Sequence, residues 1–360
     1  MKNYRPGDKY FKKLSQFLIL GFLLASQVSD ANELESKIES AFEEGSLSGL
    51  HSVLVYHKGK IVAENYFQGR DYKFSNSLGN RRFSAESLHD IRSITKNITS
   101  LLYGIALSEG LVENPDSILV DQFPYQDLKT DPARRKILVH HALAMTMGTE
   151  WDESVPYTST ENDEIAMESA PDRYRYVLDR PLVSEPGEVW NYNGGAPTLI
   201  GQMISKGVGI PIDLYAKERL FFPLGITNYE WLTGSDGTPS TAAGLRLTNH
   251  DLAKIGLMML NNGKYNGKQI VPESWIAESM IQRSVRTRSW QYGYLWWLSP
   301  ADIEPTSYDG FGNGGQRLYI SSQAKIVIVI FAGNYNIKGA WKVPDKLINE
   351  IIIPSLYKSE

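Results

Sequence analysis

The order of strand-type and helix-type segments constrains this chain most, because strands near both ends must share a sheet that the middle interrupts. Runs rich in β-branched and aromatic residues occur at residues 52–56, 60–64, 292–298, 316–320 and 325–331. The first two flank Lys58-Gly59 and predict a hairpin, whereas the last three predict an antiparallel meander. The long middle shows helical patterns and polar loops. We therefore expect an α/β (α+β) fold, with one antiparallel sheet flanked by helices and a mostly helical inserted subdomain.

Helices are expected on both sides of these strands. Residues 33–44 form a helical pattern before the first strand. Residues 251–260 form an amphipathic pattern that ends at Asn261-Asn262-Gly263, and a last helix is expected to begin near Pro344. Three parts are therefore predicted: a signal peptide at 1–31, a sheet lobe at about 32–88 and 242–360, and a helical lobe at about 89–241.

Ser93 and Lys96 stand at the start of one predicted helix, whose apolar spacing stops at Gly110. A capping box would place Glu or Gln three residues after the serine, whereas here a cation faces the positive end of the helix dipole. Residues three apart share a helical face, so Lys96 can reach the Ser93 hydroxyl. We expect burial and the dipole to lower the pKa of Lys96 and so favour a neutral amine that accepts the proton of a nucleophilic serine.

The Ser-x-x-Lys pattern alone is weak evidence for a nucleophile. Roughly one or two matches are expected by chance in a chain of this length. Three occur, at Ser93/Lys96, Ser322/Lys325 and Ser355/Lys358. Ser322 lies between strand-type runs and Ser355 follows a proline, so neither begins a helix with a buried face. The alternative for Ser93 is an ordinary N-cap beside a solvated lysine.

Residues 1–31 have the organisation of a secretory signal peptide. Lys9, Lys12 and Lys13 precede the apolar run at residues 17–25, and small residues at Ser29 and Ala31 occupy the two positions that a signal peptidase reads. The run is short for a bilayer span, so cleavage after Ala31 is expected, with an uncleaved N-terminal anchor as the alternative. We expect an exported protein, periplasmic or secreted, with no stable membrane span after cleavage.

Composition narrows the class of protein further. The chain has no cysteine, which excludes both a disulfide and a lipid-modified N-terminal cysteine. Residues 1–31 carry five Lys/Arg and two Asp/Glu, so the remainder has 32 basic and 39 acidic residues and a net charge of −7. This mild acidity gives no reason to expect a nucleic-acid partner.

Several ordered segments together resemble the serine β-lactamase and penicillin-binding protein superfamily, specifically its class C branch. The likeness runs from about Leu34 to the end of the chain. It is carried by residues 89–96, 139–146, 186–195 and 312–316. The branch includes D-alanyl-D-alanine carboxypeptidases, esterases and 6-aminohexanoate oligomer hydrolases. The resemblance implies that Ser93 is the nucleophile of an acyl-enzyme mechanism with Lys96 beside it.

The resemblance implies a second motif, Tyr-x-Asn, whose tyrosine assists proton transfer between the nucleophile and the leaving group. Tyr192 matches this tyrosine. A tyrosine is a poor base unless a nearby cation such as Lys96 favours its ionised form. Gly194 occupies the position of the asparagine. The amide expected to hold a substrate's acyl amide is therefore missing, which argues against an efficient β-lactamase.

The third motif of the family is Lys-Thr-Gly on the edge strand of the sheet. The best match here is Gly310-Phe311-Gly312 followed by Asn313, so the lysine and threonine that contact a substrate carboxylate are missing. Main-chain donors need only the right geometry, and glycine permits close approach. The backbone N–H groups of Ser93 and Asn313, beside Gly312, are therefore the candidate oxyanion hole. The alternative is a plain glycine-rich turn.

Tyr157, His140 and His141 are further candidates for a binding role. Tyr157 resembles a tyrosine with which the aminohexanoate hydrolases bind an amide nitrogen. His140 and His141 are neighbours on a predicted helix and point in different directions, so packing or capping is expected rather than a metal pair. No metal and no cofactor is expected.

The sequence thus predicts an exported serine hydrolase that cleaves a small-molecule ester or amide through Ser93, Lys96 and Tyr192. The alternatives within the superfamily are a β-lactamase or a D-alanyl-D-alanine carboxypeptidase. An alternative of another class is a non-catalytic sensor or binding protein that keeps the fold without turnover.

Overall fold

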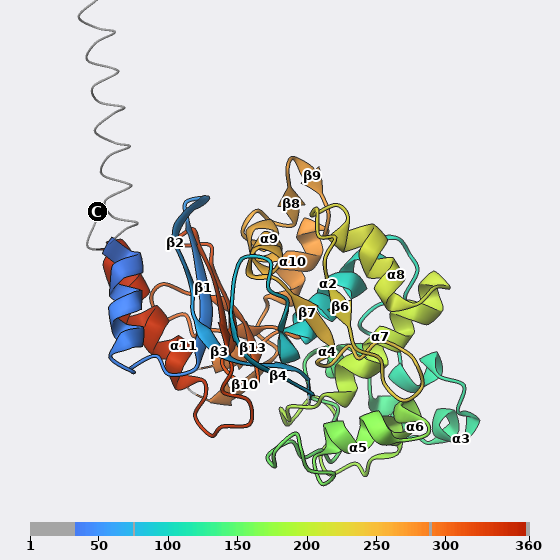
Figure 1. Ribbon diagram of the computed structural model, residues 1–360. Helices are drawn as coiled ribbons and strands as arrows, with labels where there is room; N and C mark the ends of the chain where they lie inside the picture. Colours follow the sequence, from blue (N-terminus) through green and yellow to red (C-terminus); the bar gives the residue numbers. More distant parts are fainter. Residues whose placement is uncertain (1–32, 75, 288–289, 358–360) are drawn as a thin grey trace, which may run out of the picture.

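The computed structural model describes residues 33–74, 76–287 and 290–357 (Figure 1). The predicted signal peptide lies outside these residues. The strands are β1 (Leu50–His57), β2 (Lys60–Tyr66), β3 (Gln68–Lys73), β4 (Asn76–Arg82), β5 (His89–Asp90), β6 (Glu230–Trp231), β7 (Leu245–Leu247), β8 (Lys264–Tyr265), β9 (Lys268–Gln269), β10 (Ser284–Thr287), β11 (Trp290–Tyr292), β12 (Trp297–Leu298), β13 (Tyr308–Gly312), β14 (Gln316–Ser321) and β15 (Ile326–Ala332).

The helices include one at residues 33–43, which precedes β1. The others are α2 (Thr95–Ser108), α3 (Gln126–Thr130), α4 (Val139–Leu143), α5 (Asp163–Ser169), α6 (Arg173–Asp179), α7 (Gly195–Val208), α8 (Ile212–Ala216), α9 (Asn249–Leu260), α10 (Glu273–Ser279), α11 (Lys342–Lys346) and α12 (Ile353–Tyr357). Shorter 3₁₀ and π turns are η1 (Arg92–Ile94), η2 (Leu119–Gln122), η3 (Arg134–Lys136), η4 (Lys217–Phe221) and η5 (Leu347–Ile352). No helix among the described residues has the length and hydropathy needed to cross a membrane.

One antiparallel sheet of eight strands organises the molecule, in the order β10-β11-β12-β13-β14-β15-β1-β2. The first strand of the chain pairs with the last, and Leu54 of β1 faces Val329 of β15. The predicted hairpin joins β1 to β2 through Lys58 and Gly59, which both take the left-handed backbone conformation that such tight turns require. The expectation that strands from both ends share one antiparallel sheet is therefore confirmed.

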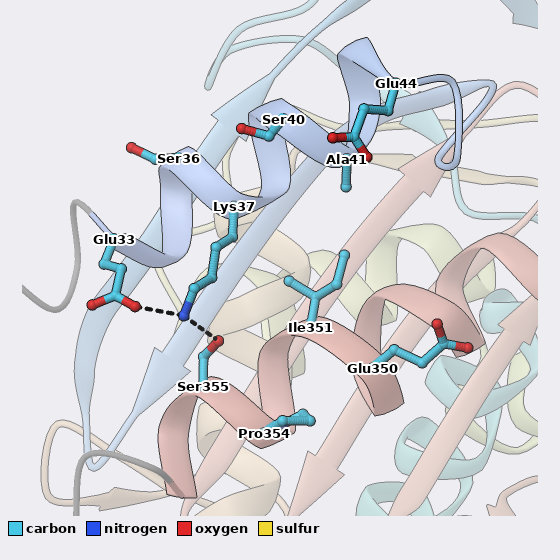
Figure 2. A pocket seen from close by; sticks show the side chains of 10 residues that line it. All are labelled: Glu33, Ser36, Lys37, Ser40, Ala41, Glu44, Glu350, Ile351, Pro354 and Ser355. Atoms are coloured by element: carbon cyan, nitrogen blue, oxygen red, sulfur yellow. Dashed lines mark hydrogen bonds and ion pairs between the residues drawn. The ribbon is translucent and has the colours of Figure 1, made fainter.

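The terminal helices cover one face of the sheet, where the blue and red helices of Figure 1 lie side by side. Alternate residues of β1 point to this face, so Val53 and Val55 are buried against the terminal helices while Leu54 belongs to the core on the other face. Figure 2 shows the seam between the two helices, where Lys37 contacts Glu33 at 2.6 Å and Ser355 at 3.3 Å. The shallow pocket at this seam shares no lining residue with the cleft that contains Ser93.

The other face of the sheet packs against helices that include α9 and α2 (Figure 1). Gly256 lies inside α9, where glycine normally weakens a helix. A Cβ atom at this position would lie 2.5 Å from Cγ1 of Val327 in β15, so the glycine allows helix and sheet to approach closely. The predicted helix at residues 251–260 is thus present, and it begins two residues earlier.

The meander differs from its prediction in two details. Residues 292–298 were expected to form one strand, but β11 ends at Tyr292 and β12 begins at Trp297. Leu295, in the connection between them, has a φ of 61°, which an extended strand does not permit. The strand of the third motif, β13, is also not an edge strand, because β12 pairs with it on the side away from β14.

Candidate active site

Ser93 lies in the 3₁₀ turn η1, directly before α2. The N-cap residue of α2 is Ile94, and no side chain caps the helix. Ser93 therefore does not act as the side-chain N-cap that the alternative interpretation required. Its hydroxyl is instead available to the side chains that surround it.

Backbone strain precedes Ser93. Arg92 has a φ of 51°, a left-handed conformation that is uncommon for a residue other than glycine. The arginine side chain is held at 3.1 Å from Asp90, donates to the Phe74 carbonyl at 2.9 Å and lies 4.6 Å from the ring centroid of Tyr335. These contacts fix the turn that presents Ser93.

Lys96 is buried in the first turn of α2, with 1% of its surface exposed. Its Nζ atom donates to Ser93 Oγ at 3.0 Å, to the Ala242 carbonyl at 2.9 Å and to Glu164 Oε2 at 3.3 Å. A protonated lysine has three N–H donors, enough for these three acceptors.

The expectation of a neutral Lys96 is wrong. Burial alone would lower the pKa of Lys96, but the negative charge of Glu164 opposes it, and Tyr192 and Glu153 add to that opposition. The net result is a pKa raised above the ordinary value for lysine. Glu164 is 68 residues away in the chain, so local helix geometry gave no sign of it.

Tyr192 lies in the loop before α7, and its ring centroid is 5.1 Å from Lys96 Nζ. Burial raises the pKa of the phenol, whereas the Lys96 charge and a hydrogen bond with Ser93 lower it. The net direction is upward. Because Lys96 already donates to Ser93, Tyr192 is the group placed to accept the serine proton once the phenol is ionised.

Two carboxylates, the half-buried Glu153 and the buried Glu164, lie near Lys96. Glu153 accepts hydrogen bonds from Trp151 Nε1 at 2.6 Å and from the Gly194 N–H at 2.5 Å through one oxygen, and from Tyr157 through the other. Burial raises the pKa of Glu153 to about 7, and the nearby charge of Glu164 acts in the same direction. Lys96 is the cation that partly compensates this pair.

Glycine lets the strand of the third motif approach the nucleophile turn. A Cβ atom at Gly312 would lie 2.5 Å from the carbonyl oxygen of Ile91, and one at Gly310 would lie 2.6 Å from Asn97 Oδ1. Asn313 follows β13 and lines the same cleft as Ser93, as the oxyanion-hole prediction requires. Its side chain points to other partners, because it exchanges hydrogen bonds with Asn336 at 2.8 and 3.0 Å.

A cleft of about 950 Å³ opens onto Ser93. Aromatic side chains dominate its walls: Trp151, Tyr157, Trp190, Tyr192, Trp290, Trp297, Phe311 and Trp341. The rings support one another, since Trp297 stacks on Phe311 at a centroid distance of 5.1 Å and on Tyr192 at 6.0 Å. Such walls suit an apolar substrate group.

The charged groups of the cleft are mostly acidic. Asp152, Glu153 and Asp345 line it, and among the described lining residues Arg317 is the one Lys or Arg. Arg317 contacts Asp345 at 2.5 Å and Asp309 at 3.3 Å and lies 3.9 Å from the Phe311 ring centroid. Its charge is therefore already compensated within the protein.

Tyr157 and His141 both make hydrogen bonds within the protein. Tyr157 lines the cleft, but its hydroxyl donates to Glu153 Oε2 at 2.6 Å, so its proton is already bound. His141 caps α4 by accepting a hydrogen bond from the Leu138 N–H at 3.1 Å, which confirms the capping interpretation. No group of three or more potential metal ligands occurs in the part of the chain that the structure describes.

Comparison with known proteins decides the family. The Beta-lactamase family model matches residues 34–337, which is most of the chain. The chain belongs to the β-lactamase family. The resemblance seen in the sequence and the antiparallel sheet flanked by helices are thereby confirmed.

Solved structures with this fold include hydrolases. A Bacillus anthracis protein provisionally named a 6-aminohexanoate-dimer hydrolase has a TM-score of 0.69 and 21% identity, over 86% of this chain and 80% of that one. A family VIII carboxylesterase has a TM-score of 0.67 and 14% identity, over 91% of this chain and 98% of that one. At these identities the likeness shows the fold alone.

Two relatives detected by sequence are less than 25% identical to this chain. A protein of Alkalihalophilus pseudofirmus is 23% identical over 77% of this chain and 82% of its own length. A protein of Mycobacterium tuberculosis is 24% identical over 62% of this chain, which spans only 57% of that relative. Both are described as uncharacterized, so neither suggests a substrate for this β-lactamase family member.

Sequence reasoning missed the acidic groups of the site. Glu164 and Glu153 come from a segment that was singled out only for Tyr157, and nothing in their spacing points to Lys96. The available signal was Gly194, because a missing polar side chain in a buried motif leaves Lys96 in need of another partner.

Proposed function

We propose that this protein is an exported serine hydrolase that cleaves a small ester or amide through an acyl-enzyme on Ser93. The observation that carries the proposal is the placement of Ser93 Oγ at 3.0 Å from Lys96 Nζ, in a cleft of about 950 Å³. The family and the hydrolases that share its fold support the reaction class. Export rests on the sequence pattern of residues 1–31.

The reaction follows from the contacts around Ser93. Tyr192 in its ionised form, which the adjacent Lys96 cation stabilises against the opposing effect of burial, takes the Ser93 proton as Oγ attacks the substrate carbonyl carbon. The Ser93 and Asn313 N–H groups stabilise the tetrahedral oxyanion. Tyr192 returns the proton to the departing alcohol or amine, which leaves acyl-Ser93. A water molecule then gives a proton to Tyr192 and attacks the acyl carbon. Tyr192 passes that proton to Ser93 Oγ as the acid leaves, which restores free Ser93 and ionised Tyr192.

The substrate proposed is uncharged and carries an apolar group. The aromatic walls provide the apolar surface, and the acidic groups of the cleft disfavour a substrate carboxylate. The one lining cation, Arg317, is already paired with two carboxylates. A β-lactam or a peptide ending in D-alanine carries a carboxylate, so these substrates fit the cleft less well than a neutral ester or amide does.

The test combines turnover with labelling of the nucleophile. Purified protein is assayed against short-chain nitrophenyl esters, linear amides and a chromogenic cephalosporin, and a fluorophosphonate probe is mapped by mass spectrometry. We expect ester turnover and a label on Ser93. Ser93→Ala should lose both while its thermal unfolding changes little, because Ser93 makes no helix-capping hydrogen bond.

Two outcomes would contradict the proposal. Wild-type turnover by Ser93→Ala would show that another group is the nucleophile. Labelling of Ser93 without turnover of any substrate in the panel would favour the sensor or binding protein instead.

A further inference from the structure

Gly194 stands where the family's second motif carries an asparagine, and its backbone does not require glycine. Its φ of −66° and ψ of −19° are accessible to any residue. A Cβ atom there would lie 2.2 Å from Glu164 Oε2 and 2.9 Å from Glu164 Cδ. Glycine is therefore required here because the Glu164 carboxylate occupies the space that a side chain at position 194 would need.

Glu164 is held firmly in this position. It lies in the first turn of α5, and its N–H donates to the side chain of Asn162, which caps the helix at 3.0 Å. The residue is 5% exposed, and its Oε2 atom is 3.3 Å from Lys96 Nζ. A buried carboxylate that lost this cation would be strongly destabilised. The negative charge of Glu164 in turn raises the pKa of Lys96 and so favours the cation.

We propose that Glu164 is a positioning residue for the reaction at Ser93: its carboxylate, in the space left by Gly194, replaces the motif's asparagine and holds Lys96 as a cation. This inference rests on the proposed function. Lys96 then directs its other two protons to Ser93 Oγ and the Ala242 carbonyl, as observed. Lys96 acts in this arrangement as a fixed positive charge, and Tyr192 acts as the base.

The charges around Lys96 determine how pH affects this arrangement. The titratable groups that act on Lys96, on Glu164 or on their immediate neighbours are Glu153, Tyr157, Glu168, Tyr192 and Tyr292. Glu164 is the strongest of the influences that raise the pKa of Lys96. Removing its charge should therefore allow Lys96 to lose its proton at a lower pH.

The first experiment compares Glu164→Gln with Glu161→Gln, a matched change at an exposed residue of the same segment. We expect kcat on a short-chain ester to fall at least ~10-fold in Glu164→Gln. A descending alkaline limb should appear in its profile of kcat/KM against pH, because Lys96 now deprotonates in the assayed range. Glu161→Gln should match the wild type, and Glu164→Asp, which keeps the charge, should recover part of the rate.

A second experiment tests the link between Gly194 and Glu164. Gly194→Ala should lower kcat at least ~10-fold because its methyl group displaces the carboxylate, whereas the same change in a Glu164→Ala background should add less than about two-fold. This comparison of single and double variants is valid only for folded protein, so thermal unfolding of each variant is measured in parallel.

The outcomes separate this inference from the proposed function. Wild-type kcat and an unchanged pH profile in Glu164→Gln would overturn the inference, as would independent, multiplicative effects of the Gly194 and Glu164 changes. Either result leaves Ser93 labelling and ester turnover by the wild type intact. Failure of the wild type to turn over substrate or label at Ser93 would instead remove the proposed function itself.

Discussion

At the scale of single residues, the site is a cluster in which one buried cation, Lys96, interacts with several acidic groups. Lys96 contacts Glu164 directly and is also influenced by Glu153 and Tyr192. Such a cluster is sensitive to the removal of any member, because the remaining charges stay buried without compensation. Chemistry and charge balance are therefore coupled at this site.

Lys96→Met should reduce the rate of acylation by at least ~10²-fold, because it removes the cation that favours ionised Tyr192. Tyr192→Phe should also lose activity, because it removes the base. The two losses should not multiply in the double variant, since both groups serve one proton transfer. Stopped-flow measurement of acyl-enzyme formation checks this. A near-native acylation rate in either single variant would remove that residue from the mechanism.

Glu153 should give stability a dependence on pH. Its pKa is raised from the ordinary 4.5 to about 7 in the folded protein, so the folded state binds more protons than the unfolded state between these values. Stability gained from Glu153 is then present below pH 4.5 and is lost as the pH rises through 7. Thermal unfolding of Glu153→Gln, measured across this interval, should decline less with rising pH than that of the wild type. Parallel curves for the two proteins would contradict the assignment.

At the scale of elements, the nucleophile turn and β13 are two separate pieces of backbone that must lie close together. Arg92 holds the turn in a left-handed conformation, and Gly312 lets the strand approach it. The proposed oxyanion hole takes one N–H group from each piece, at Ser93 and at Asn313. Their spacing therefore depends on packing between the two elements and not on any one side chain.

Gly312→Ala should test that spacing. The added methyl group meets the Ile91 carbonyl oxygen, a backbone atom that cannot rotate away, so β13 must shift from the turn. We expect kcat to fall by about 10²-fold, the scale of losing one oxyanion donor, while KM changes less. Steady-state kinetics on a short-chain ester, with thermal unfolding as a control for folding, would show this. Full kcat in a folded variant would place the oxyanion elsewhere.

At the scale of the whole molecule, the cleft combines walls from the middle of the chain and from its C-terminal part. Arg317 and Phe311 come from the sheet, whereas Trp151 and Tyr192 come from the helical middle. The result is an aromatic, mildly acidic cavity whose selectivity follows from the assembled surface.

Substrate preference should follow from that surface. A cephalosporin presents a carboxylate and an acyl amide, and the family residues that would receive them are replaced here by glycine at Gly310 and Gly194. We expect short-chain ester turnover at least ~10²-fold faster than cephalosporin hydrolysis, which corresponds to about 2.7 kcal/mol of transition-state stabilisation. The measurement is kcat/KM for both substrates on one enzyme preparation. A cephalosporin value equal to the best ester would restore β-lactamase as the leading function.

The sequence predicted the sheet and the neighbourhood of Ser93 because both depend on local patterns. Runs of β-branched residues in β1 and β15 and the helical spacing after Ser93 are visible in short windows. The protonation state of Lys96 was not predictable in this way, because Glu164 reaches it through tertiary packing. The break between β11 and β12 was missed for a related reason. The left-handed residue there is Leu295, and leucine is not a residue from which a turn is normally predicted.

The position of β1 between β2 and β15 also has a consequence for folding. Leu54 and Val329 are partners in the centre of the sheet, yet they lie 275 positions apart in the sequence, so their pairing closes a very long loop. Long-range pairing of this kind folds slowly. A chain that ends before Ile326 leaves β1 and β14 without their shared neighbour, and two apolar strands then expose unpaired backbone edges. Such a fragment should self-associate, since exposed strand edges recruit other chains.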